Sequence, residues 1–166
     1  MEIDARKKGI YLVVNPQMDL GELLKKISLL KNQGIVAVQI WDNFSDKQDV
    51  MTLLKKISQE IKAYHIPLLI NNRWEYVNTE YVDGVHFDKI PLSIEEIKSS
   101  IKKDKYIIGL TCGNDIKTIE WAEENKIDYI SFCSIFPSDS AGDCEIVDHA
   151  FIKKAREKFS KDIYLS

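Results

Sequence analysis

The sequence lacks any apolar run that could span a membrane. Its longest apolar stretches, such as IYLVV and IPLLI, fall far short of the roughly 20 residues that a transmembrane helix needs. The N-terminal stretch MEIDARKKGIYLVVN has no long apolar segment after its charges, so it does not resemble a signal peptide. We therefore expect a cytoplasmic protein with no membrane partner.

Cysteine is scarce, and basic charge is not in excess. The three cysteines, Cys112, Cys133 and Cys144, are odd in number and show no CxxC spacing. This argues against a disulfide framework and against a structural zinc site, so we expect reduced thiols. The net charge is −3 and basic residues are mixed with acidic ones. The mixture does not predict a nucleic-acid partner, and a small molecule is the expected ligand.

Common motifs of nucleotide and hydrolytic chemistry are also absent. No GxGxxG or GxxxxGK[ST] follows an apolar run, and the chain contains no GxSxG or HExxH. The three histidines, His65, His86 and His149, are not spaced as metal ligands on one element. Any function must therefore come from residues that the fold gathers from separate strand ends.

What the chain does have is a regular alternation of short apolar runs with segments of helical period, which is typical of βα units and a parallel sheet. Seven strands are predicted: IYLVVN from Ile10, VAVQIW from Val36, IPLLIN from Ile66, GVHF from Gly84, YIIGLT from Tyr106, YISFCS from Tyr129 and IYLS from Ile163. No linker-like composition divides residues 1–166, so we predict a single domain. A (β/α)8 barrel and an open doubly wound sheet both fit.

The intervening segments predict helices with defined beginnings. Three of them open with capping patterns, Asp19 with Glu22, Ser45 with Gln48, and Ser93 with Glu96. Two more are expected over Ile116–Ala122 and from near Asp148. The linker from Trp74 to Tyr81 is too short for more than about two turns and stays ambiguous.

Polar residues follow most of the predicted strands. In both architectures ligands gather at the carboxyl ends of strands, so these residues are candidates for a site. The set comprises Asn15, Gln39, Trp41, Asn71, Asn72, Arg73, His86, Asp88, Lys89, Thr111, Cys112, Ser134 and the segment SIFPSDSAGD. Each has an ordinary alternative, because strand ends normally meet water. His86 can be a packed core histidine, and Trp41 can cap the sheet instead of stacking on a ligand.

Taken in order, the motifs YLVVN, VQIWDN, LLINNR, GVHF, IIGLT and DYISFCSIFPSDS resemble the thiamine phosphate synthase family and its sister, the TenI thiazole tautomerases. The resemblance covers nearly the whole chain. It implies a (β/α)8 barrel, here with about seven strands. It also implies coupling of hydroxymethylpyrimidine diphosphate with thiazole phosphate, with Mg2+ as cofactor and thiazole or pyrimidine phosphates as partners.

The resemblance also assigns roles to residues. Gln39 and Asn71 match polar contacts that the family uses, and Ser138 and Ser140 replace two threonines that contact diphosphate. Trp41, Asn43 and Ala141 stand where the family has cations. Asn72 and Pro91 replace its two metal-binding aspartates, and Gly113 stands at the tautomerase histidine. The predicted substrate-binding set is Gln39, Trp41, Asn71, Asn72, Arg73, His86, Thr111, Ser138 and Ser140, with no metal ligand and no catalytic residue assigned.

These substitutions predict a divergent member with weak or no synthase activity, because losing one charge-stabilising group commonly costs about 10²- to 10³-fold in rate. Asp42, Asp88 or Asp139 could supply a displaced carboxylate. One alternative is a non-catalytic heterocycle-binding or regulatory protein. Another is different phosphosugar chemistry that uses the strand-end cations Arg73 and Lys89. The sequence ends within its seventh strand, so we expect either that the chain is a fragment or that a partner, such as a second copy, covers the barrel edge.

Overall fold

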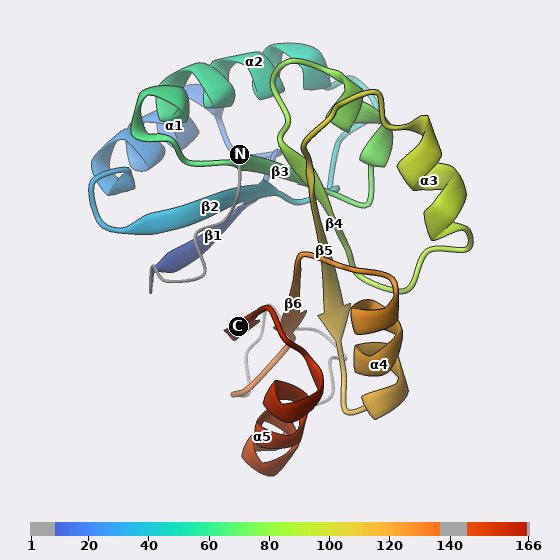
Figure 1. Cartoon of the computed structure of the whole chain (residues 1–166). Coiled ribbons are helices and arrows are strands. Elements are labelled where there is room, and N and C mark those ends of the chain that lie inside the picture. Colours follow the sequence, from blue (N-terminus) through green and yellow to red (C-terminus); the bar gives the residue numbers. More distant parts are fainter. Residues whose placement is uncertain (1–8, 137–145, 166) are drawn as a thin grey trace. The chain divides into compact units, whose positions relative to one another are not determined.

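The computed structural model describes residues 9–136 and 146–165. It contains all seven predicted strands, which alternate with helices along the chain (Figure 1). The chain divides into two compact units. One comprises Met1–His86 with Ile97–Ile107, and the other comprises Phe87–Glu96 with Ile108–Ser166.

The first unit holds four strands in sequence order: β1 (Ile10–Val14), β2 (Ile35–Ile40), β3 (Leu68–Asn71) and β4 (Gly84–Phe87), of which Phe87 belongs to the second unit. All three pairings are parallel. Gln39 lies opposite Val13 on one side and Leu69 on the other, and Asn71 lies opposite His86. Side chains alternate between the two faces of a strand, so this register places Gln39, Asn71 and His86 on one face.

Two helices cover the other face of these strands. They are α1 (Leu20–Leu30) and α2 (Val50–Ile61), which pack against each other (Figure 1). Leu23 and Ile27 are the buried residues of α1, and Leu53, Leu54, Ile57 and Ile61 are those of α2. The predicted cap of α1 is confirmed, because the Asp19 carboxylate accepts a hydrogen bond from Glu22 N at 3.0 Å.

The predicted beginning of α2 is wrong. Asp49, and not Ser45, caps the helix, and its carboxylate accepts from Thr52 N at 3.0 Å. Ser45 and Gln48 do bond to each other, but they form a turn before the helix. The Gln48 amide donates to the carbonyl of Pro16, which anchors that turn to the loop after β1. A carboxylate is a stronger acceptor for orphan helix N–H groups than a hydroxyl, and this favours the later start.

The ambiguous linker forms a short 3₁₀ helix, η2 (Trp74–Asn78), and another, η1 (Lys62–Tyr64), follows α2. Helix α3 (Ile94–Ser100) begins directly after Ser93 and crosses from the second unit into the first.

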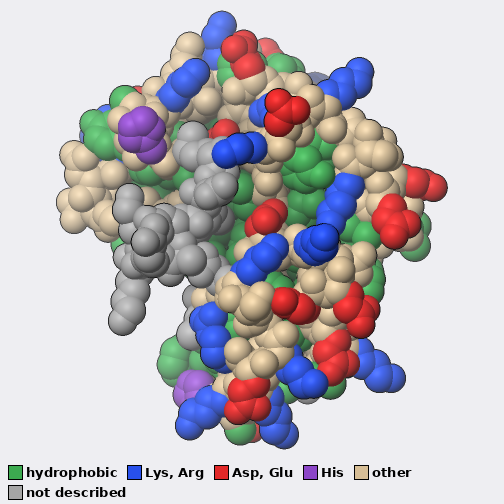
Figure 2. All heavy atoms as spheres, in the orientation of Figure 1, with side chains coloured by type: hydrophobic (Ala, Val, Ile, Leu, Met, Phe, Trp, Pro, Cys, Tyr) green, Lys and Arg blue, Asp and Glu red, His purple; other side chains and the backbone are tan. Residues whose placement is uncertain are grey.

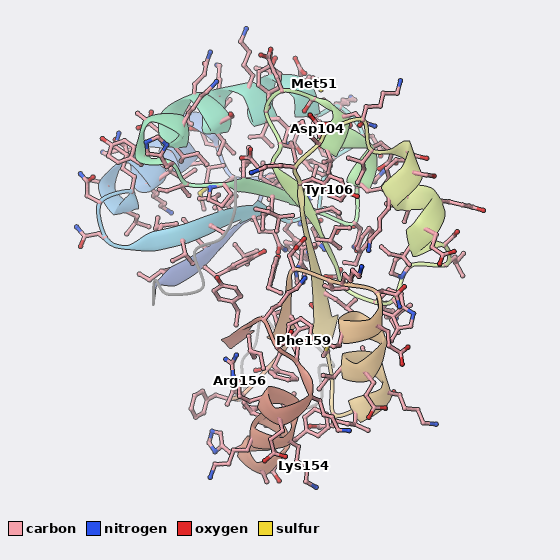
Figure 3. The ribbon with its side chains drawn as sticks, in the orientation of Figure 1. Met51, Asp104, Tyr106, Lys154, Arg156 and Phe159 are labelled. Carbon is pink, nitrogen blue, oxygen red and sulfur yellow. The ribbon has the colours of Figure 1, made fainter. Side chains whose placement is uncertain are left out.

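The second unit contains three parallel strands in sequence order, β5 (Ile107–Cys112), β6 (Tyr129–Phe132) and β7 (Asp162–Leu165), of which Ile107 belongs to the first unit. Its helices α4 (Ile116–Glu124) and α5 (His149–Lys158) pack together, and the predicted start at Asp148 is confirmed by its bond from Ala150 N. Phe159, labelled in Figure 3, closes α5 and is fully buried.

Glycine is required at one position of this unit. A Cβ atom at Gly109 would lie 2.1 Å from Cζ of Tyr129, so only glycine lets the tyrosine ring cross β5.

Two aspartates form the same backbone clamp, one in each unit. Asp83 precedes β4. Its N–H donates to Leu68 O at 2.7 Å and its carboxylate accepts from Leu68 N at 2.9 Å. Asp128 precedes β6 and repeats both bonds with Ile108, each at 2.8 Å. Each carboxylate accepts a hydrogen bond from a backbone N–H at or next to the start of a neighbouring buried strand, so that this buried N–H group has an acceptor.

We expect Asp83→Ala to lower the free energy of unfolding by about 1 to 3 kcal/mol, because it leaves the buried N–H of Leu68 without its acceptor. Urea unfolding followed by circular dichroism measures this. The exposed Asp104 (Figure 3) provides the control, and Asp104→Ala should change the value by less than about 0.5 kcal/mol. Equal losses in the two variants would contradict the clamp.

Candidate ligand site at the strand ends

The first unit gathers four polar or aromatic side chains on one face of its strands. Gln39, Asn71 and His86 are buried, with exposed fractions of 6%, 1% and 4%. The hydroxyl of Tyr11 donates to Gln39 Oε1 at 2.5 Å, and the Tyr11 ring lies 6.3 Å from the His86 ring at a tilt of 59°. Three of the predicted site residues are therefore brought together in a buried cluster.

Tyr11 was not predicted to belong to this cluster. It lies two residues before Val13 on β1, so it shares the face that Val13 turns toward Gln39. The sequence IYLVV could have indicated this role, because Tyr11 is the only residue of the strand whose side chain ends in a polar group. Because the Tyr11 hydroxyl donates to Gln39 Oε1, the Gln39 NH2 group points away from Tyr11 and can donate to a different acceptor.

Beyond the buried cluster, the loops after β2 and β3 meet. Asn72 Nδ2 donates to Asp42 Oδ2 at 3.0 Å, and Gln17 Nε2 donates to Asn43 Oδ1 at 3.1 Å. The loop rim is thus made mainly of amides, with Asp42 as a carboxylate among them. Trp41 is 45% exposed at the end of β2.

Arg73 is also exposed and precedes η2. The structure places both Arg73 and Trp41 at the strand ends, as the sequence predicts, and their part in ligand binding stays a prediction.

Within the second unit, hydroxyl groups lie near the ends of β5 and β6. Thr111 Oγ1 and Ser131 Oγ lie 3.3 Å apart on paired residues. Ser134 is buried, and its carbonyl accepts from Val147 N at 2.9 Å. Ser138 and Ser140 lie outside the described residues, so their predicted role stays a prediction.

The described residues do not fit a preformed Mg2+ site. Mg2+ binding relies on carboxylate oxygens, supplemented by water and substrate phosphates. Across residues 9–136 and 146–165, no group of three or more His, Cys, Asp or Glu side chains could hold a metal ion. At the strand ends, the Asp42 carboxylate accepts a hydrogen bond from the neutral amide of Asn72.

Comparison with known proteins identifies the family. A family model described as thiamine monophosphate synthase matches residues 10–165. The chain belongs to the thiamine monophosphate synthase family. Within it, the thiamine-phosphate synthase of Methanobrevibacter smithii is 28% identical over 146 residues, covering 88% of this chain and 69% of that protein. That of Clostridium botulinum strain Loch Maree is 27% identical over 142 residues, covering 84% and 67%.

Solved structures confirm the fold predicted for this family member. The thiamine phosphate pyrophosphorylase of Pyrococcus furiosus superposes with a TM-score of 0.76 at 17% identity, covering 98% of this chain and 76% of that one. This likeness supports the (β/α)-barrel type over the doubly wound sheet, here with seven strands. A phospho-2-dehydro-3-deoxyheptonate aldolase from Thermotoga maritima shares the fold with a TM-score of 0.63 at 13% identity, covering 95% and 50%.

Cys112 lies beside Thr111 but is not part of the polar face. It is fully buried, and this burial, with a smaller contribution from Asp115, raises the pKa of its thiol to about 12. The thiol therefore stays protonated at neutral pH and is a poor nucleophile.

We expect iodoacetamide at pH 8 to leave Cys112 unmodified in the folded protein and to modify it in urea, since only the thiolate reacts. Peptide mass spectrometry measures the extent of labelling at each cysteine. Cys133, which is half-buried, is the internal comparison and should react faster in the folded state. Rapid labelling of Cys112 in the native protein would contradict the assigned burial.

Proposed function

We propose that the strand-end site binds a phosphorylated thiazole or pyrimidine intermediate of thiamine biosynthesis, and that coupling of the two heterocycles is weak or absent. Family membership supports the substrate class. The observation that carries the proposal is the cluster of buried Gln39, Asn71 and His86 with the half-buried Tyr11, which retains the two family-matched amides. Buried neutral amides recognise the edges of heterocycles through directed hydrogen bonds.

Weak coupling follows from the groups around the cluster. A departing diphosphate needs cations and a metal to stabilise its charge. Trp41 and Asn43 occupy positions where the resemblance implies cations, and Asn72 occupies one where it implies a metal-binding aspartate. The described rim supplies amide dipoles in place of these charges, and dipoles stabilise a developing diphosphate less than full charges do.

A second candidate is a non-catalytic heterocycle-binding or regulatory protein of thiamine metabolism. The hydrogen bond between Asn72 and Asp42 favours it, because the carboxylate faces a neutral donor. The two candidates differ in whether any coupling occurs. Slow, Mg2+-dependent formation of thiamine phosphate supports the divergent enzyme, whereas Mg2+-independent binding without product supports the binding protein.

The direct test incubates the purified protein with hydroxymethylpyrimidine diphosphate, thiazole phosphate and Mg2+, and follows thiamine phosphate by chromatography. We expect little product, together with saturable binding of at least one heterocycle in calorimetry. Robust turnover would refute the loss of synthase chemistry. Failure to bind any of these heterocycles would refute the proposed ligand class.

We expect Gln39→Ala to weaken heterocycle binding about tenfold or more, because it removes a buried donor at the site. Calorimetry with the unphosphorylated and phosphorylated heterocycles measures the change. Gln33→Ala is the matched control, since Gln33 is exposed and precedes β2, at the opposite end of the same strand. An unchanged affinity in a folded Gln39→Ala variant would place the ligand elsewhere.

A further inference from the structure

The pair formed by Asp42 and Asn72 joins the loops after β2 and β3. These strands are parallel neighbours, with Ile40 opposite Ile70, so their carboxyl ends lie side by side. Asn72 Nδ2 lies 3.0 Å from Asp42 Oδ2. Both side chains are half-buried, which keeps them accessible from the rim. A carboxylate here is therefore held by one directed neutral donor.

The backbone fixes the position of Asn72. Its φ is 56°, in the left-handed region that asparagine, aspartate and glycine tolerate best. Its N–H donates to His86 O at 2.8 Å, and its carbonyl accepts from Trp74 N at 3.0 Å. Asparagine and aspartate are nearly equal in shape, so either residue can occupy this position with the same backbone and the same side-chain direction.

We propose that the Asn72 amide takes the place of a divalent cation beside Asp42, so that the identity of residue 72 decides whether this rim binds metal. With asparagine, the NH2 group donates a hydrogen bond to the carboxylate, and the pair carries one negative charge in place of two. With aspartate, two carboxylates would face each other within hydrogen-bond reach. Like charges at that separation repel, and a divalent cation removes the repulsion by bridging them.

This inference deepens the proposed function, and rests on it only for the ligand. It predicts that a heterocycle bound at the strand ends needs no metal in this protein. EDTA should therefore leave the affinity of the wild type for the heterocycle unchanged. The absence of any heterocycle binding would count against the proposed function, while the metal titration below, which contains no heterocycle, would still test the pair itself.

The test uses Mn2+ alone as the probe, because it accepts the oxygen ligands that Mg2+ accepts and is visible by electron paramagnetic resonance. We expect Asn72→Asp to bind Mn2+ about tenfold or more tightly than the wild type, because it adds a second carboxylate beside Asp42. The double variant Asn72→Asp with Asp42→Asn should lose this gain. Asn32→Asp, at an exposed turn after α1, controls for the added charge and should gain nothing.

Thermal unfolding gives a second readout for the same variants. Asn72→Asp should melt at a lower temperature than the wild type in EDTA, and Mn2+ should restore much of the difference. If Asn72→Asp does not fold, the single variant Asp42→Asn still tests the proposal. It should bind Mn2+ as weakly as the wild type does. The proposal would be overturned if the wild type bound Mn2+ tightly and Asp42→Asn abolished that binding. It would also be overturned if a folded Asn72→Asp variant bound Mn2+ no more tightly than the wild type.

Discussion

The strand-end site depends on one backbone acceptor, the carbonyl oxygen of His86. It accepts from the N–H of Asn72 at 2.8 Å and from the side-chain amide of Asn71 at 3.2 Å. The first bond holds the chain as it leaves β3 in the left-handed conformation, and the second directs a buried amide along the sheet. This acceptor helps to fix where β3 ends, and from that position Asn72 donates to Asp42.

The chemistry of the site follows from neutral groups held rigidly. Tyr11 orients Gln39, His86 orients Asn71, and Asn72 satisfies Asp42, so each amide has a defined direction. Preorganised dipoles of this kind select a ligand by the pattern of its donors and acceptors. They stabilise separated charge less well than cations and metals do, and this is why recognition of a heterocycle is easier to retain here than transfer of a diphosphate.

Charged side chains of both signs are interspersed on the visible surface (Figure 2). Within the described residues, no helix has the length and apolarity to cross a membrane.

Much of the fold was predictable because local patterns and tertiary packing agree. The seven apolar runs are strands, and Asp19 and Asp148 cap helices where the sequence indicates. The start of α2 was not predictable, since Ser45 and Gln48 form a capping pattern while Asp49, the residue directly after Gln48, makes the stronger cap. The Gln48 side chain instead donates to the carbonyl of Pro16, a partner that is remote in the sequence. The clamps made by Asp83 and Asp128 could likewise not be predicted from the sequence, because their partners lie 15 and 20 residues away.

The sequence alone determined the alternation of strands and helices, the family, and the residue types at each strand end, because these depend on local periodicity and on ordered motifs. Only the tertiary structure decided which of those side chains meet. It brought Tyr11 to Gln39 and Asn72 to Asp42, contacts that span 28 and 30 residues and depend on strand register. The physical reason is that a hydrogen bond requires a distance and a direction, and parallel strand pairing sets both.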